Sequence, residues 1–140
     1  MTRRTLLDTG PLVAFLDRRD RYHGWATTHL GELIAPLFTC EPVLSEACFL
    51  LRQVHGGGTA VLELVRRGLL QIDFRLEENA GPVAKLLVRY ADVPMSLADA
   101  CLVRMAELQP ASGLLTLDRD FRVYRRHGRQ VIATTMPDGP

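Results

Sequence analysis

The feature that most constrains the fold is an alternation of short apolar segments with longer segments of helical pattern. This pattern predicts strands at 5–7, 68–74, 112–118 and 130–134, with a brief apolar segment at 37–40. It predicts helices at 11–16, 23–33, 42–55, 59–67, 76–90 and 97–108, and a short helical turn from Asp120. Strands that alternate with helices form a mostly parallel sheet covered by helices. The expected fold class is therefore α/β, with three layers and a mostly parallel central sheet.

Length and composition limit the class of protein. A chain of 140 residues, 47% of them hydrophobic, fits a single domain over 1–140, in which 136–140 would form a frayed tail. The net charge of +1 excludes a bulk polycation that coats nucleic acid. No signal peptide is present, and no apolar run approaches the roughly 18 residues of a membrane span. We therefore expect a cytoplasmic protein that does not enter membranes.

Two acidic residues stand where predicted strands end. Asp8 follows the first apolar strand, and Asp118 ends the strand at 112–118, with Asp120 as an alternative two residues further on. Open α/β folds bind ligands at the carboxyl edge of the sheet. If the two strands are parallel, both acids face that edge.

Two further acidic residues, Glu46 and Asp99, lie on predicted helices next to apolar side chains. Glu46 flanks an apolar stripe formed by Val43, Ala47, Leu50, Leu51 and Val54, so we expect its carboxylate to be partly withdrawn from water. The alternative for Glu46 is a salt bridge to Arg4 or Arg52. Asp99 precedes three apolar residues on its helix, at 102, 103 and 106.

Helix capping is the alternative explanation for two of these acids. Asp8 or Thr9 could cap the helix that begins at Pro11. Ser96 and Asp99 match the pattern of a capping box. Taken singly, neither acid distinguishes a cap from a functional carboxylate.

Taken together, the four acids predict a metal site. Carboxylates held close together repel one another unless divalent cations neutralise them. Ligation by oxygen alone favours Mg²⁺ or Mn²⁺ over zinc, and such a site lowers the pKa of a bound water and hydrolyses phosphate esters. A haloacid-dehalogenase-type phosphatase also begins with an aspartate after its first strand, but it carries a second acid two residues on, where this chain has Gly10.

The segments LLDTGPLVAFLD, EPVLSEACFLLR, SLADACLVRMAE and LLTLDRDFRVY, in this order, resemble the four acidic motifs of PIN-domain ribonucleases, and most closely those of VapC-type toxins. The resemblance runs from residue 5 to about 134. It implies that Asp8, Glu46, Asp99 and Asp118 bind the metal, and that Thr9 and Thr116 support them. It also implies Mg²⁺- or Mn²⁺-dependent cleavage of single-stranded RNA to 5′-phosphate and 3′-hydroxyl ends. Ser96 stands where some members of the family carry a further acid.

Basic residues directly after Asp118 are candidates for binding RNA. Arg119, Arg122 and Arg126 would share one helical face, and we expect them to contact phosphates. Phe121 is expected in the core, and Tyr124 is available for packing or for base stacking. The alternative is a solvated terminal helix that Phe121 anchors.

The resemblance also implies protein partners. We expect the helices at 11–16 and 23–33 to expose PLVAFL and WATTHL, surfaces that small PIN toxins cover in homodimers and with a cognate antitoxin. The remaining alternative for function is a non-catalytic RNA- or protein-binding module in which the acids serve only as caps.

Overall fold

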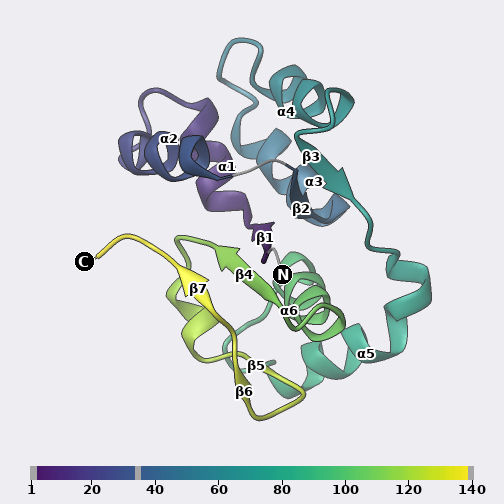
Figure 1. The fold of residues 1–140 in the computed structure, drawn as a ribbon. Coiled ribbons are helices and arrows are strands. Elements are labelled where there is room, and N and C mark those ends of the chain that lie inside the picture. Colours follow the sequence, from purple (N-terminus) through teal and green to yellow (C-terminus); the bar gives the residue numbers. More distant parts are fainter. Residues whose placement is uncertain (1–2, 34–35, 139–140) are drawn as a thin grey trace.

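The computed structural model describes residues 3–33 and 36–138. Its central element is a five-stranded sheet (Figure 1). Its strands are β1 (Arg4–Leu7), β2 (Leu37–Thr39), β3 (Leu70–Ile72), β4 (Ser112–Leu115) and β7 (Thr134–Thr135), in the order β3-β2-β1-β4-β7. Every pair of neighbours in this sheet is parallel. The predicted α/β class with a parallel sheet is therefore confirmed.

In the described part of the chain, six α-helices surround the sheet: α1 (Thr9–Leu16), α2 (His23–Glu32), α3 (Glu41–Leu50), α4 (Gly57–Arg66), α5 (Leu76–Arg89) and α6 (Leu97–Leu108). A 3₁₀-helix, η1, covers Arg119–Arg122. The helix predicted at 42–55 is too long, because the chain turns after Leu50 to bury Leu51 completely. Leu50 itself is 54% exposed, so its place in the predicted apolar stripe is wrong.

The end of the chain differs most from expectation. One strand was predicted at 130–134, but two short strands form there. β6 (Gln130–Val131) pairs antiparallel with β5 (Arg125–Arg126), while β7 joins the main sheet. The hairpin between β5 and β6 turns through His127 and Gly128, whose φ angles of 51° and 76° are left-handed. The expected strand is divided after Val131, where the chain leaves the hairpin and passes to the main sheet at Thr134.

A single cluster of buried side chains joins the sheet to its helices. Leu6 and Leu7 of β1 are each 1% exposed, and Phe121 is fully buried, which confirms its predicted place in the core. Cys40 and Cys101 are buried free thiols, and Cys48 is a partly buried one. None of the helices in the described ranges is long and apolar enough to cross a membrane.

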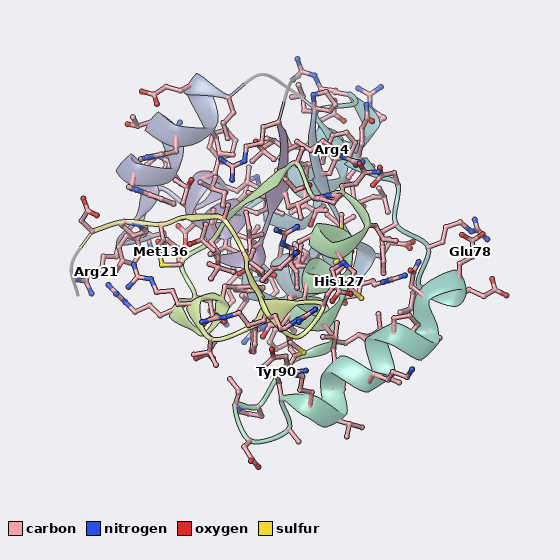
Figure 2. The ribbon with its side chains drawn as sticks, turned by 60° about the horizontal axis from the view of Figure 1, so that its bottom comes forward. Arg4, Arg21, Glu78, Tyr90, His127 and Met136 are labelled. Atoms are coloured by element: carbon pink, nitrogen blue, oxygen red, sulfur yellow. The ribbon has the colours of Figure 1, made fainter. Side chains whose placement is uncertain are left out.

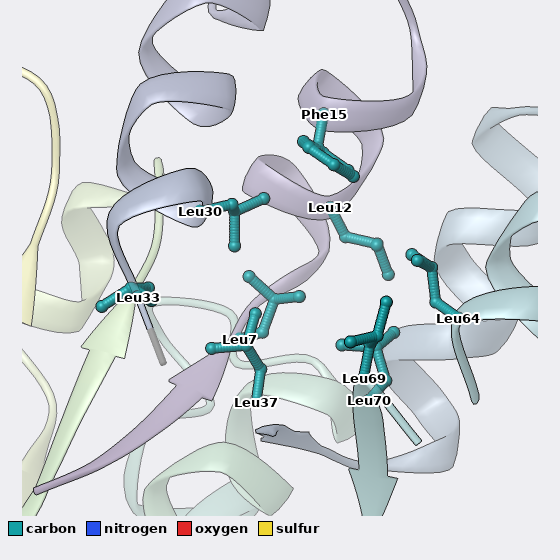
Figure 3. A pocket seen from close by; sticks show the side chains of 9 residues that line it. All are labelled: Leu7, Leu12, Phe15, Leu30, Leu33, Leu37, Leu64, Leu69 and Leu70. Atoms are coloured by element: carbon teal, nitrogen blue, oxygen red, sulfur yellow. The ribbon is translucent and has the colours of Figure 1, made fainter. Parts of the chain in front are cut away.

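An apolar cavity of about 120 Å³ lies between α1, α2, α4 and the sheet (Figure 3). Leu12 and Phe15 of α1, Leu30 of α2 and Leu64 of α4 point into it. The prediction that 11–16 is an exposed apolar surface is largely wrong, since α1 packs against α2 and α3 and buries Leu12 completely.

Candidate active site

The site begins where β1 and β4 end side by side. Leu7 is in register with Leu115, so that the next residues, Asp8 and Thr116, leave the sheet as neighbours. The Asp8 N–H donates to the carbonyl of Leu115 at 3.1 Å, and the Thr116 hydroxyl donates to Asp8 Oδ2 at 2.6 Å. The strand order reverses between β1 and β4, and such a switch point is where open α/β sheets form a crevice for ligands.

Asp8 is also the N-cap of α1. Its Oδ1 accepts a hydrogen bond from the Thr9 N–H at 2.7 Å. The Thr9 hydroxyl donates in turn to Glu46 Oε2 at 2.9 Å. Thr9 therefore connects two of the four predicted acids, one through its backbone and one through its side chain.

Glu46 lies on α3 and is exposed to solvent, so the expectation that burial would withdraw it from water is wrong. The buried face of α3 runs through Val43 and Ala47. Glu46, like Leu50, therefore lies on the exposed side of the helix. Arg4 instead forms its salt bridge with Asp73. Arg52 donates to the Phe49 carbonyl at 2.8 Å.

Asp99 enters the site from the first turn of α6. The predicted capping box is present: the Asp99 N–H donates to Ser96 Oγ at 3.0 Å, and the Ser96 N–H donates to Asp99 Oδ2 at 3.4 Å. The same Oδ2 accepts a hydrogen bond from the Tyr124 hydroxyl at 3.0 Å. Capping accordingly does not remove Asp99 from the site.

Asp118 follows β4 and caps η1. Its N–H donates to Thr116 Oγ1 at 2.9 Å, and its Oδ1 accepts from the Asp120 N–H at 2.9 Å. The Thr116 hydroxyl, which is fully buried, therefore donates to Asp8 and accepts from Asp118. The negative charge of Asp118 is one of those that raise the pKa of Asp8.

The pKa values of Asp8 and Asp99 are raised in part by the charges of neighbouring acids. Burial raises the pKa of Asp8 to about 6, and the negative charges of Asp99 and Asp118 contribute to the rise, against the hydrogen bonds from Thr116 and Thr9. Burial also raises the pKa of Asp99, with a further contribution from Asp118. Three carboxyl groups from β1, β4 and α6 thus share one electrostatic environment.

Comparison with known proteins agrees with this geometry. The family model described as PIN domain matches residues 5–127. The chain belongs to the PIN domain family. No curated protein sequence matches it.

Two solved structures share the PIN fold. VapC20 of Mycobacterium tuberculosis, described as a Sarcin-Ricin loop cleaving toxin, superposes with a TM-score of 0.77 at 19% identity, over 85% of this chain and 93% of that one. VapBC2 of Rickettsia felis, described as bound to a DNA fragment from its promoter, superposes with a TM-score of 0.61 at 11% identity, over 96% and 98%. At these identities the similarity establishes the fold.

The donor set of this PIN domain suits a hard divalent cation. All four predicted ligands are carboxylates, and the buried Asp8 is the kind of acid whose ionised form a cation stabilises. As the side chains stand, no three His, Cys, Asp or Glu residues within 3–33 and 36–138 are grouped so that they could hold a metal ion. Glu46 accepts a hydrogen bond from the Thr9 hydroxyl, Asp99 from the Tyr124 hydroxyl and Asp118 from the Asp120 amide.

The predicted RNA-binding arginines do not form one helical face. Arg119 and Arg122 lie on η1, but the helix ends there and Arg126 lies on β5, so the prediction of a shared face is wrong. The reason is the hairpin, which takes the chain out of the helical path. Tyr124 is fully buried, which excludes base stacking by its ring.

Sequence reasoning missed the contact between Tyr124 and Asp99. A tyrosine in an otherwise basic segment was interpreted only as an aromatic ring. Its hydroxyl matters because a buried phenol needs a hydrogen-bond partner, and the acid that provides it lies 25 residues away in sequence. The spacing of Phe121 and Tyr124, which both face the core, is the signal that could have indicated a buried phenol.

Proposed function

We propose that this PIN domain is a Mg²⁺- or Mn²⁺-dependent endoribonuclease that cleaves single-stranded RNA. The observation that carries the proposal is the electrostatic coupling of Asp8, Asp99 and Asp118 at the switch point of the sheet. Three carboxylates in one environment disfavour one another's ionisation. A phosphodiester is a substrate that such a site can hydrolyse once divalent cations balance these charges.

In this proposal Asp8, Glu46, Asp99 and Asp118 hold the cation, which supplies an activated water and offsets charge on the leaving oxygen. Thr116 orients Asp8 by a 2.6 Å hydrogen bond, and Thr9 orients Glu46 by one of 2.9 Å. These hydroxyl groups fix two acids from different elements relative to each other. Arg119, Arg122 and Arg126 follow Asp118 in the chain and contact the phosphates of the substrate.

The test is an RNA cleavage assay with Mg²⁺, with Mn²⁺ and with EDTA, on the wild-type protein and on the variants Asp8→Asn and Asp99→Asn. We expect cleavage with either metal, products with 5′-phosphate ends, and loss of activity with EDTA or in either variant. Cleavage that persists in EDTA or in both variants would contradict the proposal.

A second candidate is a non-catalytic RNA- or protein-binding PIN module. The observation in its favour is that Asp8, Asp99 and Asp118 each cap a helix, so that each acid has a structural role as well. This candidate predicts that wild-type protein leaves single-stranded RNA intact under every metal condition, and that Asp99→Asn lowers stability without any change in RNA binding.

We further propose that the chain is the toxin of a toxin–antitoxin pair and that it forms a homodimer. The support is the shared fold with VapC20 and with the VapBC2 proteins. The leucine-lined cavity between α1, α2 and α4 offers an apolar segment of an antitoxin a place to bind (Figure 3). Induced expression in a bacterial host should stop growth, whereas Asp8→Asn should not. Sequencing of the new 5′ ends in RNA from those cells would identify the substrate.

A further inference from the structure

We propose that Tyr124 is a positioning residue, which holds the carboxylate of Asp99 in place for the metal site. This inference rests on the proposed function and adds a residue to it. The Tyr124 hydroxyl donates to Asp99 Oδ2 at 3.0 Å. The other donor to that oxygen, the Ser96 N–H, is 3.4 Å away, at the edge of hydrogen-bonding distance. The phenol is therefore the stronger constraint on the carboxylate.

The core fixes where the phenol can be. Tyr124 is fully buried, and its ring meets Phe121 edge-on at 5.1 Å between centroids and Tyr90 at 5.0 Å. Its N–H also donates to the Asp120 carbonyl at 3.1 Å. Because the ring and the backbone of Tyr124 are both held, the position of its hydroxyl is fixed. The orientation of the Asp99 carboxylate is therefore set by a rigid part of the molecule.

The contact also joins two parts of the proposed site. Asp99 belongs to α6, whereas Tyr124 lies six residues after Asp118, in the segment that follows β4. A hydrogen bond between these segments sets the distance between Asp99 and Asp118 as well as the angle of Asp99. Removal of a side chain that hydrogen-bonds to a metal ligand in this way commonly lowers metal affinity or activity by about 10- to 100-fold.

Tyr90 provides a matched control. It is also a tyrosine of the same aromatic cluster, it is 8% exposed, and it lies at the end of α5 (Figure 2). Its hydroxyl, however, accepts a hydrogen bond from the Arg125 N–H at 3.0 Å and does not take part in the acidic site. Replacement of either tyrosine by phenylalanine removes one buried hydroxyl and keeps the ring packing.

The experiment compares Tyr124→Phe with Tyr90→Phe. Mn²⁺ binding is measured by isothermal titration calorimetry, kcat and KM are measured for a single-stranded RNA, and thermal unfolding monitors the fold. For Tyr124→Phe we expect the Mn²⁺ dissociation constant to rise about 10-fold and kcat to fall by about 10-fold or more, with little change in KM. For Tyr90→Phe we expect a lower melting temperature with Mn²⁺ affinity and kcat at the wild-type level.

A double variant keeps the test valid if Tyr124→Phe folds poorly. Tyr124→Phe leaves a partly buried carboxylate with one donor fewer, and Asp99→Asn removes that charge while it keeps the shape of the side chain, so the double variant should fold. Without the Asp99 charge, Tyr124→Phe should cause no further loss of Mn²⁺ affinity beyond that of Asp99→Asn. An additional loss in the double variant would overturn the positioning role.

The two proposals fail in different ways. Wild-type protein that binds Mn²⁺ and cleaves RNA, together with a Tyr124→Phe variant indistinguishable from Tyr90→Phe, would overturn the role of Tyr124 alone. Wild-type protein that neither binds Mn²⁺ nor cleaves RNA would overturn the proposed function and this inference with it.

Discussion

Burial of the Asp8 side chain opposes the ionisation of its carboxyl group. Its side chain accepts two hydrogen bonds, which favour the carboxylate, yet burial and two neighbouring acids raise its pKa from 3.8 to about 6. One pKa unit corresponds to about 1.4 kcal/mol. In the absence of metal, ionised Asp8 therefore destabilises the fold by about 3 kcal/mol.

The first prediction concerns the pH dependence of stability. The pKa of Asp8 is higher in the folded state than in the unfolded state, so its favourable contribution is complete below about pH 4 and is lost as the pH rises through about 6. In EDTA, the free energy of unfolding of wild type relative to Asp8→Asn should fall by about 2.5 kcal/mol between pH 4 and pH 7.5. Urea unfolding at several pH values measures it.

The control for this prediction is Asp138→Asn, which changes an exposed aspartate near the end of the chain. Its stability should follow that of the wild type at every pH. Parallel curves for wild type and Asp8→Asn would mean that Asp8 titrates normally in the folded protein.

Residue identity predicted part of the site. Asp8 and Asp118 could be recognised because a parallel sheet brings the carboxyl ends of its strands to one edge, and the register of Leu7 with Leu115 does so. Glu46 was expected to be partly withdrawn from water and is exposed, because α3 buries only the face that carries Val43 and Ala47, and tertiary packing decides which face that is. The bond from Tyr124 to Asp99 depends on tertiary packing and has no signature in local sequence.

At the scale of elements, the junction between α3 and α4 depends on a close approach. A Cβ atom at Gly57 would lie 2.7 Å from the carbonyl oxygen of Leu51 and 2.8 Å from its Cβ. Leu51 is fully buried, so neither atom can move away cheaply. The start of α4 therefore requires a glycine at 57, whereas a Cβ at Gly58 would meet nothing within 4 Å.

The second prediction compares alanine at these two adjacent positions. Gly57→Ala should destabilise the protein by about 1–3 kcal/mol because it forces the backbone or Leu51 to shift. Gly58→Ala should leave stability unchanged or raise it by up to about 1 kcal/mol, since alanine favours the helix. Thermal unfolding of both variants measures the difference, and equal stabilities would contradict the packing described here.

Elements were predictable to different degrees. The bounds of α6 match the prediction because its capping box and apolar face mark both ends. β1, β2, β3 and β4 each carry buried apolar side chains, and their existence followed from pattern. β6 and β7 could not be separated, because β6 pairs with β5 and β7 with β4, and these partners depend on tertiary structure.

At the scale of the whole molecule, a net charge of +1 gives little general attraction for RNA. Binding must then depend on where the arginines lie. Arg122 and Arg126 belong to different elements, η1 and the β5–β6 hairpin, and both elements belong to the segment that follows Asp118. A local group of cations beside an acidic site can orient a phosphate backbone without coating it.

The third prediction tests this arrangement by the salt dependence of RNA binding. Arg126→Gln should weaken binding of single-stranded RNA and reduce the slope of log K against log salt by about 0.7, the value for one phosphate contact on a single strand. Arg75→Gln is the control, because Arg75 pairs with Glu77 and Glu78 at the start of α5. Equal slopes for wild type and both variants would exclude a phosphate contact by Arg126.

The position of β1 has a consequence for synthesis of the chain. β1 is made first but lies at the centre of the sheet, and its neighbour β4 is more than 100 residues later, so that Asp8 and Thr116 are 108 positions apart. A nascent chain that has not reached β4 cannot bring Asp118 beside Asp8. If the protein is a ribonuclease, the ribosome that translates it is therefore not exposed to the assembled catalytic groups until the segment that carries Asp118 has been made.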